Sequence, residues 1–324
     1  MTSPLIVVGM PRSGSTLLTR ILNESPDLFI VNDFYYLQYV DSVNGFTSVD
    51  NELSQTLAKE VLDRIKARIE RLDSPELECG LYFSESNERE LENFVRDNCQ
   101  KDTFTWSELL EKIMTFSASL IDKKKWGYNT PQDYLHIDRL EKHFPQAKFI
   151  YLMRDPRAVL RSYKNVQSNG YHETNRYHPI IQTLAWRTAM QSFLTRKSHN
   201  NCILIRYEDL IGNTDRELSR IGQFIGTQFH KIDLSQFGNN SSFKNKVKKS
   251  DLSPTEIWLC EQIAGEEMEI IDYSLSGIKP NFKDTFYIAK LSVKVTKFYL
   301  YKVLLSSDVR KRTIQVMKKA FARR

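Results

Sequence analysis

Two short segments of the chain carry candidate phosphate-binding residues, and the first has the glycine spacing of a phosphate-binding loop. The first is LIVVGMPRSGSTLL, which begins at Leu5 and carries Gly9 and Gly14. The two glycines permit a tight turn and a close approach of an anion to backbone N–H groups. The helix expected to begin near Ser15 adds the positive end of its dipole. We therefore expect this loop to bind a phosphate or sulfate group.

The loop has the glycine spacing of nucleotide-binding P-loops but lacks their lysine, because Ser15 stands at that position. That lysine reaches the β and γ phosphates of ATP. Its replacement favours a nucleotide whose 5′ group ends one position beyond the first phosphate. Arg12 supplies a cation from inside the loop, and its guanidinium can hold two oxygens of a phosphate or sulfate at once.

The second segment is FIYLMRDPRAVLRSYKN, residues 149–165. It predicts a buried strand that ends at Arg154 and a following helix that carries Ser162. Open α/β sheets bind ligands at the carboxyl ends of their strands, which is where Arg154 is expected to lie. Ser162 follows eight residues later, about two helical turns on. Both side chains are therefore candidates for a second phosphate site.

In their order along the chain, the two segments resemble the signature of sulfotransferases that use 3′-phosphoadenosine 5′-phosphosulfate (PAPS). The similar branch has PRSG(S/T)T loops and includes tyrosylprotein enzymes and many bacterial enzymes of the carbohydrate and lipid type. The resemblance implies that Arg154 and Ser162 hold the 3′-phosphate, the group that distinguishes PAPS from ATP. It assigns to the 5′-phosphosulfate the loop residues Pro11, Arg12, Ser13, Gly14, Ser15 and Thr16.

Two later segments are candidates for further contacts with the nucleotide. Residues 205–209, IRYED, resemble a family element whose tyrosine helps to hold the nucleotide, so Tyr207 is assigned that role. The alternative is a tyrosine that packs in the core at a strand end. Residues 237–249 resemble the loop that closes over the nucleotide, with Ser241 or Ser242 as a contact, or else they form a flexible basic loop.

The acceptor hydroxyl needs a base. In the tyrosylprotein branch a glutamate lies twenty-one residues after the loop arginine, and the same count from Arg12 leads to Asp33. The alternative is that Asp33 caps a helix beginning near Phe34. Other branches use a histidine, and His172 and His178 are the rival bases in this chain.

Many relatives have a lysine that contacts the transferring group in a K-x-P or K-T-P element. Here the corresponding segment is WGYNTP, residues 126–131, with Asn129 at the lysine position. An amide can donate one hydrogen bond to a sulfuryl oxygen but brings no charge. Arg12 would then stabilise more of the charge on the leaving phosphate.

The resemblance implies a reaction. Asp33 takes the acceptor proton, the sulfuryl group moves in line, and Arg12 with the loop N–H groups stabilises the departing phosphate oxygen. PAPS is the co-substrate, and no metal is expected. The alternatives are a P-loop kinase that uses ATP and a membrane-associated protein that binds PAP, the desulfated nucleotide, without catalysis. The acceptor stays open among a saccharide, a lipid head group, a peptide tyrosine and a small hydroxylated molecule.

Composition indicates an ordinary soluble globular protein, with 324 residues of which 41% are hydrophobic. The four cysteines, Cys79, Cys99, Cys202 and Cys260, lack metal-ligand spacing and are expected to be reduced thiols. The chain enters its first strand without the features of a signal peptide, so we expect a cytoplasmic protein.

Short apolar runs alternate with helical segments, which predicts a P-loop-type three-layer α/β fold around a parallel sheet. The predicted strands are Leu5–Val8, Phe29–Val31, Lys148–Met153 and Cys202–Arg206. Helical patterns between about residues 34 and 125 predict an insertion that caps the acceptor side. We expect one domain over 1–284 and a basic helical tail over 285–324.

The tail carries a net charge of +10, whereas residues 1–284 carry −4. Apolar residues at helical spacing accompany these cations, so the tail suits an anionic membrane surface, and this favours a glycan or glycolipid acceptor at the inner membrane face. The alternative is a helical pair that packs on the body or on a second subunit. Lysines interrupt every apolar stretch, which excludes a spanning helix, and we expect no nucleic-acid partner.

Overall fold

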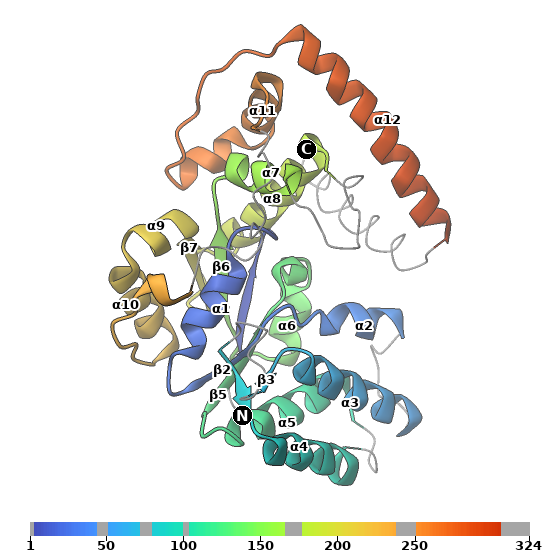
Figure 1. Ribbon diagram of the computed structural model, residues 1–324, viewed down its shortest axis with the longest axis vertical. Helices are drawn as coiled ribbons and strands as arrows, with labels where there is room; N and C mark the ends of the chain where they lie inside the picture. The colour runs from blue at the N-terminus through green and yellow to red at the C-terminus, as the bar shows by residue number, and fades with distance from the viewer. Residues whose placement is uncertain are drawn as a thin grey trace. The chain divides into compact units, whose positions relative to one another are not determined.

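The computed structural model describes residues 3–43, 51–71, 80–99, 104–165, 177–237 and 251–305. In these ranges helices and strands follow one another along the chain (Figure 1). Five of the strands form one sheet in the order β2-β5-β1-β6-β7. The strands are β1 (Leu5–Gly9), β2 (Leu28–Val31), β3 (Glu70–Arg71), β4 (Tyr82–Phe83), β5 (Lys125–Asn129), β6 (Lys148–Met153) and β7 (Cys202–Arg206). The predicted α/β class with a central parallel sheet is confirmed.

The helices between and after these strands have the following bounds. They are α1 (Ser15–Asn23), α2 (Tyr36–Ser42), α3 (Asn51–Lys66), α4 (Glu85–Asn98), α5 (Trp106–Ser119), α6 (Ile137–His143), α7 (Pro156–Lys164), α8 (Pro179–Leu194), α9 (Tyr207–Gly212), α10 (Thr214–Ile225), α11 (Pro254–Ile270) and α12 (Phe282–Leu305), with short 3-10 turns η1 (Pro131–Leu135) and η3 (Leu234–Phe237).

Strand β1 lies at the centre of the sheet, parallel to both β5 and β6. All five of its residues are buried, as is usual for a parallel strand covered on both faces. The four predicted strands are confirmed as β1, β2, β6 and β7. Strand β5 was not among them, because its sequence KWGYN interrupts the apolar pattern with a lysine, a glycine and an asparagine.

Gly127 lets β5 approach β1 closely. A Cβ atom on Gly127 would lie 2.0 Å from the carbonyl oxygen of Leu5, so every other residue would be too large there. On either side of the glycine, Trp126 and Tyr128 are fully buried. The strand that completes the sheet between β1 and β2 therefore depends on one missing side chain.

The chain divides into two compact units, each with its own core. The first comprises Met1–Gly9, Gly14–Leu152 and Lys197–Phe237 and contains the sheet. Its principal apolar cluster joins β1, α1, β2, β6, α9 and α10. In this unit, helices α3, α4 and α5 follow β2 and precede β5 along the chain, and they pack against one another. This arrangement agrees with the predicted helical insertion.

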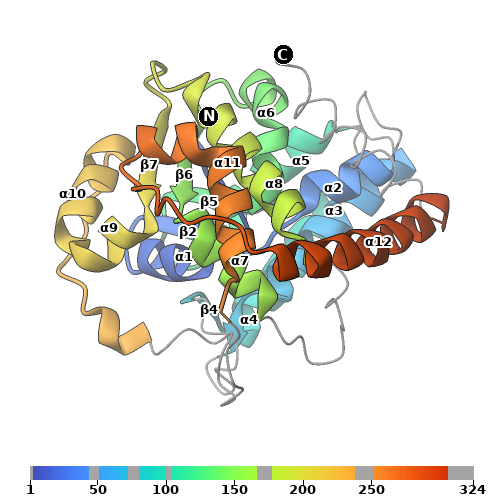
Figure 2. The same cartoon turned by 90° about the horizontal axis from the view of Figure 1, so that it is seen from above.

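The second unit comprises Met10–Ser13, Met153–Arg196 and Gly238–Arg324. Its helices α7, α8 and α11 pack on one another (Figure 2), and α12 packs against α11. A cluster of buried side chains, among them Leu160, Cys260 and Leu291, fills this contact. The division that we predicted at residue 284 stays a prediction. Within the described ranges, no helix combines the length and the apolar character that a membrane crossing needs.

Candidate phosphate-binding and catalytic site

The first helix begins at a glycine with a left-handed backbone. Gly14, with φ 96°, is the N-cap of α1, and its carbonyl accepts the first helical hydrogen bond from the N–H of Leu18 at 3.1 Å. The N–H groups before Leu18 have no partner in the preceding turn of the helix, which is the arrangement that binds anions at helix starts. Of the predicted loop residues, Ser15 and Thr16 form this first turn, and Thr16 is exposed.

The ring of Tyr207 lies against Gly14. A Cβ atom on Gly14 would approach that ring to 2.4 Å. Tyr207 is almost completely buried and belongs to the apolar cluster of the first unit. The structure thus supports the core-packing interpretation of Tyr207, and its contact with a nucleotide stays a prediction.

Arg12 has an unusual backbone conformation in the second unit. Its φ is 75°, a region that few residues other than glycine adopt, and the N–H of Ser13 closes the turn on the carbonyl of Met10 at 3.2 Å. The Nε atom of Arg12 donates to Oγ of Ser162 at 3.2 Å. Strained backbone of this kind often occurs at functional sites, and here it directs a cation toward α7.

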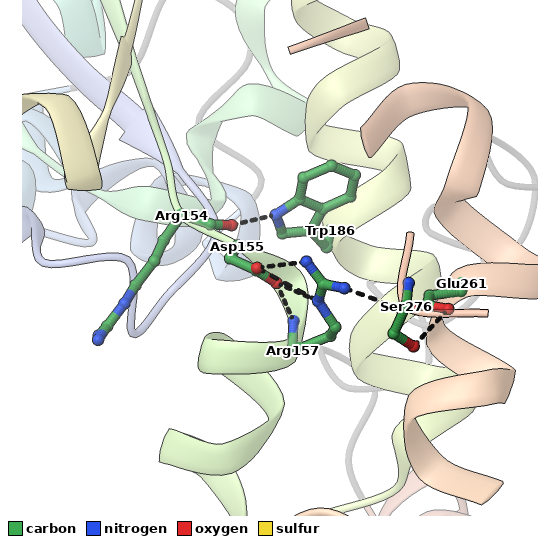
Figure 3. Close-up of polar contacts among 6 residues, drawn as sticks. All are labelled: Arg154, Asp155, Arg157, Trp186, Glu261 and Ser276. Atoms are coloured by element: carbon green, nitrogen blue, oxygen red, sulfur yellow. Dashed lines mark hydrogen bonds and ion pairs between the residues drawn. The ribbon is translucent and has the colours of Figure 1, made fainter. Parts of the chain in front are cut away.

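Arg154 joins the same cluster from the end of β6. Its Nη1 atom donates to the carbonyl of Arg12 at 3.5 Å, and its own carbonyl accepts a 2.8 Å bond from Nε1 of Trp186 (Figure 3). The Arg154 side chain points away from Trp186 in this view. The structure therefore brings together Arg12, Arg154 and Ser162, which the sequence had assigned to the two ends of the nucleotide.

Ser13 has a buried hydroxyl that forms no hydrogen bond with any residue in the described part of the chain. A buried polar group without a partner costs about 1–3 kcal/mol. An oxygen of a bound ligand could accept this hydrogen and remove the cost. The neighbouring Pro11 is half-buried.

Asp33 follows β2 and also has a left-handed backbone, with φ 49°. It does not cap a helix, because α2 begins only at Tyr36 and its N-cap is Tyr35. The capping alternative is therefore wrong, whereas the role of base stays a prediction. A long contact of 3.5 Å joins Oδ2 of Asp33 to Nδ2 of Asn32.

Asn129 does not fit the expectation that its amide reaches a sulfuryl oxygen. The side chain is fully buried, and its Nδ2 atom donates to Oδ1 of Asn32 at 2.6 Å. The amide of Asn32 in turn lies 3.5 Å from Oγ1 of Thr16 and from Oδ2 of Asp33. Asn129 thus supports Asn32, which lies between the end of the phosphate loop and the candidate base.

The alternative base, His178, is buried and its side chain has a hydrogen-bond partner. Its Nε2 atom lies 2.8 Å from Oγ of Ser292 on α12, and burial lowers the pKa of its imidazole. His172, Ser241 and Ser242 lie outside the described residues. In the part of the chain that is described, no three His, Cys, Asp or Glu side chains gather as a metal site, and Cys99, Cys202 and Cys260 are free thiols.

Sequence reasoning missed the groups that support this site. Asn32 directly precedes Asp33, and its position at a strand end was an available signal. Trp186 carried no such signal, because it lies in α8 and meets Arg154 only through the packing of helices.

Comparisons with known proteins place the chain among sulfotransferases. The family model described as "Sulfotransferase family" matches residues 4–231. A Caenorhabditis briggsae protein named "Putative protein-tyrosine sulfotransferase" is 22% identical over 311 residues, which cover 87% of this chain and 95% of that protein. Human sulfotransferase 2A1 is 26% identical over 170 residues, 48% of this chain and 58% of its own. The solved sulfotransferase domain of the Synechococcus PCC 7002 olefin synthase aligns with 82% of this chain and 96% of its own, at 20% identity and a TM-score of 0.47.

Proposed function

The chain belongs to the sulfotransferase family and transfers a sulfuryl group from PAPS to an acceptor hydroxyl, and from this premise we propose the residues that do so. Arg154 and Ser162 bind the 3′-phosphate. The loop from Pro11 to Thr16 binds the 5′-phosphosulfate, with Arg12 as its cation.

One observation carries this assignment: the direct contact of Arg12 with both Arg154 and Ser162. The Arg12 guanidinium lies on the Ser162 hydroxyl, and the Arg154 guanidinium lies on the backbone carbonyl of Arg12. Two arginines and a hydroxyl at one loop favour a ligand with more than one anionic group. PAPS has such groups at its 3′ and 5′ positions.

In the proposed mechanism Asp33 accepts the proton of the acceptor hydroxyl as its oxygen attacks sulfur. The bond from sulfur to the bridging phosphate oxygen breaks, and negative charge builds on that oxygen. Arg12 and the N–H groups at the start of α1 stabilise this charge. Removal of one such donor typically costs about 3–4 kcal/mol of transition-state stabilisation.

Calorimetric titration with PAP and with adenosine 5′-monophosphate (AMP) tests the assignment, because the two nucleotides differ only in the 3′-phosphate. We expect PAP to bind more tightly than AMP without Mg²⁺, and Arg154→Ala to abolish the difference. The matched control is Arg161→Ala on α7, since Arg161 is an exposed arginine paired with Asp251. Equal binding of PAP and AMP by the unaltered protein, or tighter binding of Mg·ATP, would contradict the assignment.

For the acceptor we propose a glycan or glycolipid at a membrane surface, on the basis of α12. Phe282, Phe286 and Val293 are exposed by 89%, 78% and 57% and share one side of the helix by their spacing. Ile288 and Leu291 lie on the opposite side and are buried. Lys283, Lys290 and Lys297 are exposed on this helix. Exposed aromatic rings beside cations suit a layer of anionic lipid head groups.

Vesicle co-sedimentation tests the membrane contact. The full chain should bind vesicles that contain phosphatidylserine and release them at high salt, and the double variant Phe282→Ser, Phe286→Ser should bind more weakly. Ile211→Ser is the control, because Ile211 is an exposed apolar residue on α9. Equal binding by the double variant, or equal binding to pure phosphatidylcholine, would contradict the proposal.

A further inference from the structure

Arg157 lies in the second phosphate motif, yet carboxylates engage its guanidinium. Its Nε and Nη2 atoms form a fork on Asp155, with Nη2 2.7 Å from Oδ2, and its Nη1 atom donates to Oε1 of Glu261 at 2.8 Å (Figure 3). These bonds, first of all those to Asp155, raise the pKa of Arg157. All three nitrogens of the guanidinium donate to protein, so Arg157 acts as a structural link rather than as a phosphate ligand.

Glu261 is the fixed end of this link. It projects from α11, its side chain is only 6% exposed, and both of its oxygens accept hydrogen bonds. Oε1 accepts from the backbone N–H of Ser276 at 2.9 Å, in addition to Arg157, and Oε2 accepts from the hydroxyl of Ser276 at 3.0 Å. A carboxylate that accepts three hydrogen bonds has little freedom to turn, so it holds the Arg157 guanidinium in one position.

Asp155 connects Arg157 to the proposed nucleotide site, because it directly follows Arg154 in the chain. Its carboxylate also caps α7 by accepting the N–H of Arg157 at 2.8 Å. The carbonyl of Arg154 itself accepts a hydrogen bond from Trp186. The backbone from which the Arg154 side chain extends is thus held by α8 directly and by α11 through Glu261, Arg157 and Asp155.

We propose that Glu261 is a positioning residue for the 3′-phosphate, which it serves by holding Arg157 on Asp155 and so orienting Arg154 and the start of α7. This inference rests on the proposed function, in which Arg154 binds the 3′-phosphate. Loss of the Glu261 contact lets the Arg157 guanidinium turn away from Asp155. The Arg154 side chain is then less well oriented toward the 3′-phosphate.

The readout is the ratio of PAP affinity to AMP affinity, measured by calorimetry on the full chain. A general loosening of the fold would lower both affinities and leave their ratio unchanged. Glu261→Gln removes the negative charge that pairs with Arg157 and should lower the ratio about tenfold, which corresponds to the weakening of one charge-assisted hydrogen bond. Ser276→Ala, a milder change that removes one bond to Oε2, should lower it less.

Glu267→Gln is the matched control. Glu267 is also a buried carboxylate of α11 in an ion pair, 2.7 Å from Arg187 on α8. Its partners among the described residues are Arg187 and Gln191, and it does not contact Arg157. An unchanged ratio in Glu261→Gln, or an equal fall in Glu267→Gln, would overturn the inference. If the unaltered protein itself failed to prefer PAP to AMP, the assignment of Arg154 would fail first, and the two failures are therefore distinguishable.

Discussion

The Nε atom of Arg12 lies 3.2 Å from the Oγ atom of Ser162, although 150 residues separate them in the sequence. One residue belongs to the loop assigned to the 5′-phosphosulfate and the other to the helix assigned to the 3′-phosphate. A charge-assisted contact of this kind couples the two assignments, since a change in either side chain alters the position of the other.

A double-mutant cycle on PAP binding should reveal this coupling. Arg12→Ala and Ser162→Ala should each weaken binding, and the double variant should be less weakened than the sum of the two predicts, by about 1 kcal/mol. Calorimetry at constant salt measures all four affinities. Additive effects, with a deviation below about 0.3 kcal/mol, would show that the two residues act independently.

Asp33→Asn should abolish transfer while PAP binding is retained. Loss of a general base lowers the rate by about 100-fold or more, and an amide of the same size keeps the local packing. Transfer is measured with labelled PAPS against a panel of hydroxylated acceptors. Asp41→Asn is the control, because Asp41 pairs with Arg139 on α6 and should leave the rate unchanged. A fully active Asp33→Asn variant would return the question of the base to the histidines.

Tyr207→Phe separates the two interpretations of this ring. If the ring acts only by packing on Gly14, the phenylalanine variant should bind PAP with normal affinity and Tyr207→Ala should bind weakly or unfold. Calorimetry and thermal melting measure the two effects. A large loss of PAP affinity in the phenylalanine variant at unchanged melting temperature would instead assign the hydroxyl to the nucleotide.

Gly127→Ala should strongly destabilise the first unit, because the new methyl group would meet the carbonyl of Leu5 at 2.0 Å. Overpacking against a backbone atom costs about 3 kcal/mol. The control is Gly212→Ala at the end of α9, where a Cβ atom has no neighbour within 4 Å. This variant should be neutral or more stable by up to about 1 kcal/mol, and denaturant unfolding compares the two.

Stability should fall when the pH drops below the ordinary histidine value of 6.5, partly because of His178. Burial lowers the pKa of its imidazole, so the unfolded chain takes up a proton in a pH range where the folded protein does not. The loss develops between 6.5 and the lowered pKa. His178→Gln should have a shallower pH profile of unfolding free energy, and an unchanged profile in this variant would contradict the prediction.

The sequence predicted those parts of the fold whose pattern is local. Leu5–Val8 and residues 149–153 are continuous apolar runs, and both form buried parallel strands. Strand β5 was not predicted because its residues suit a strand only in contact with other parts of the chain. Position 127 needs a glycine because β1 lies so close beside it. The buried amide of Asn129 at the strand end donates a hydrogen bond to Asn32.

The candidate site divides in the same way. Arg12, Arg154 and Ser162 could be named from motif and strand-end position, since these are properties of neighbouring residues. The contact between Arg12 and Ser162 could not be predicted, because it depends on how a loop meets a helix far along the chain. The burial of Asn129 could not be predicted either, because it also depends on packing between distant parts of the chain. The short motif around Asn129 suggested a ligand contact instead.

Glu261 lies outside the region that the family model matches, which ends at residue 231, and 104 residues beyond the arginine that it holds. Two proteins could therefore share every letter of both phosphate motifs and still differ in how strongly they distinguish PAP from AMP. Sequence divergence in α11 would then tune cofactor selectivity while the signature itself stayed constant. A protein of this kind can therefore keep the two phosphate motifs in evolution and still change its selectivity for PAP over AMP.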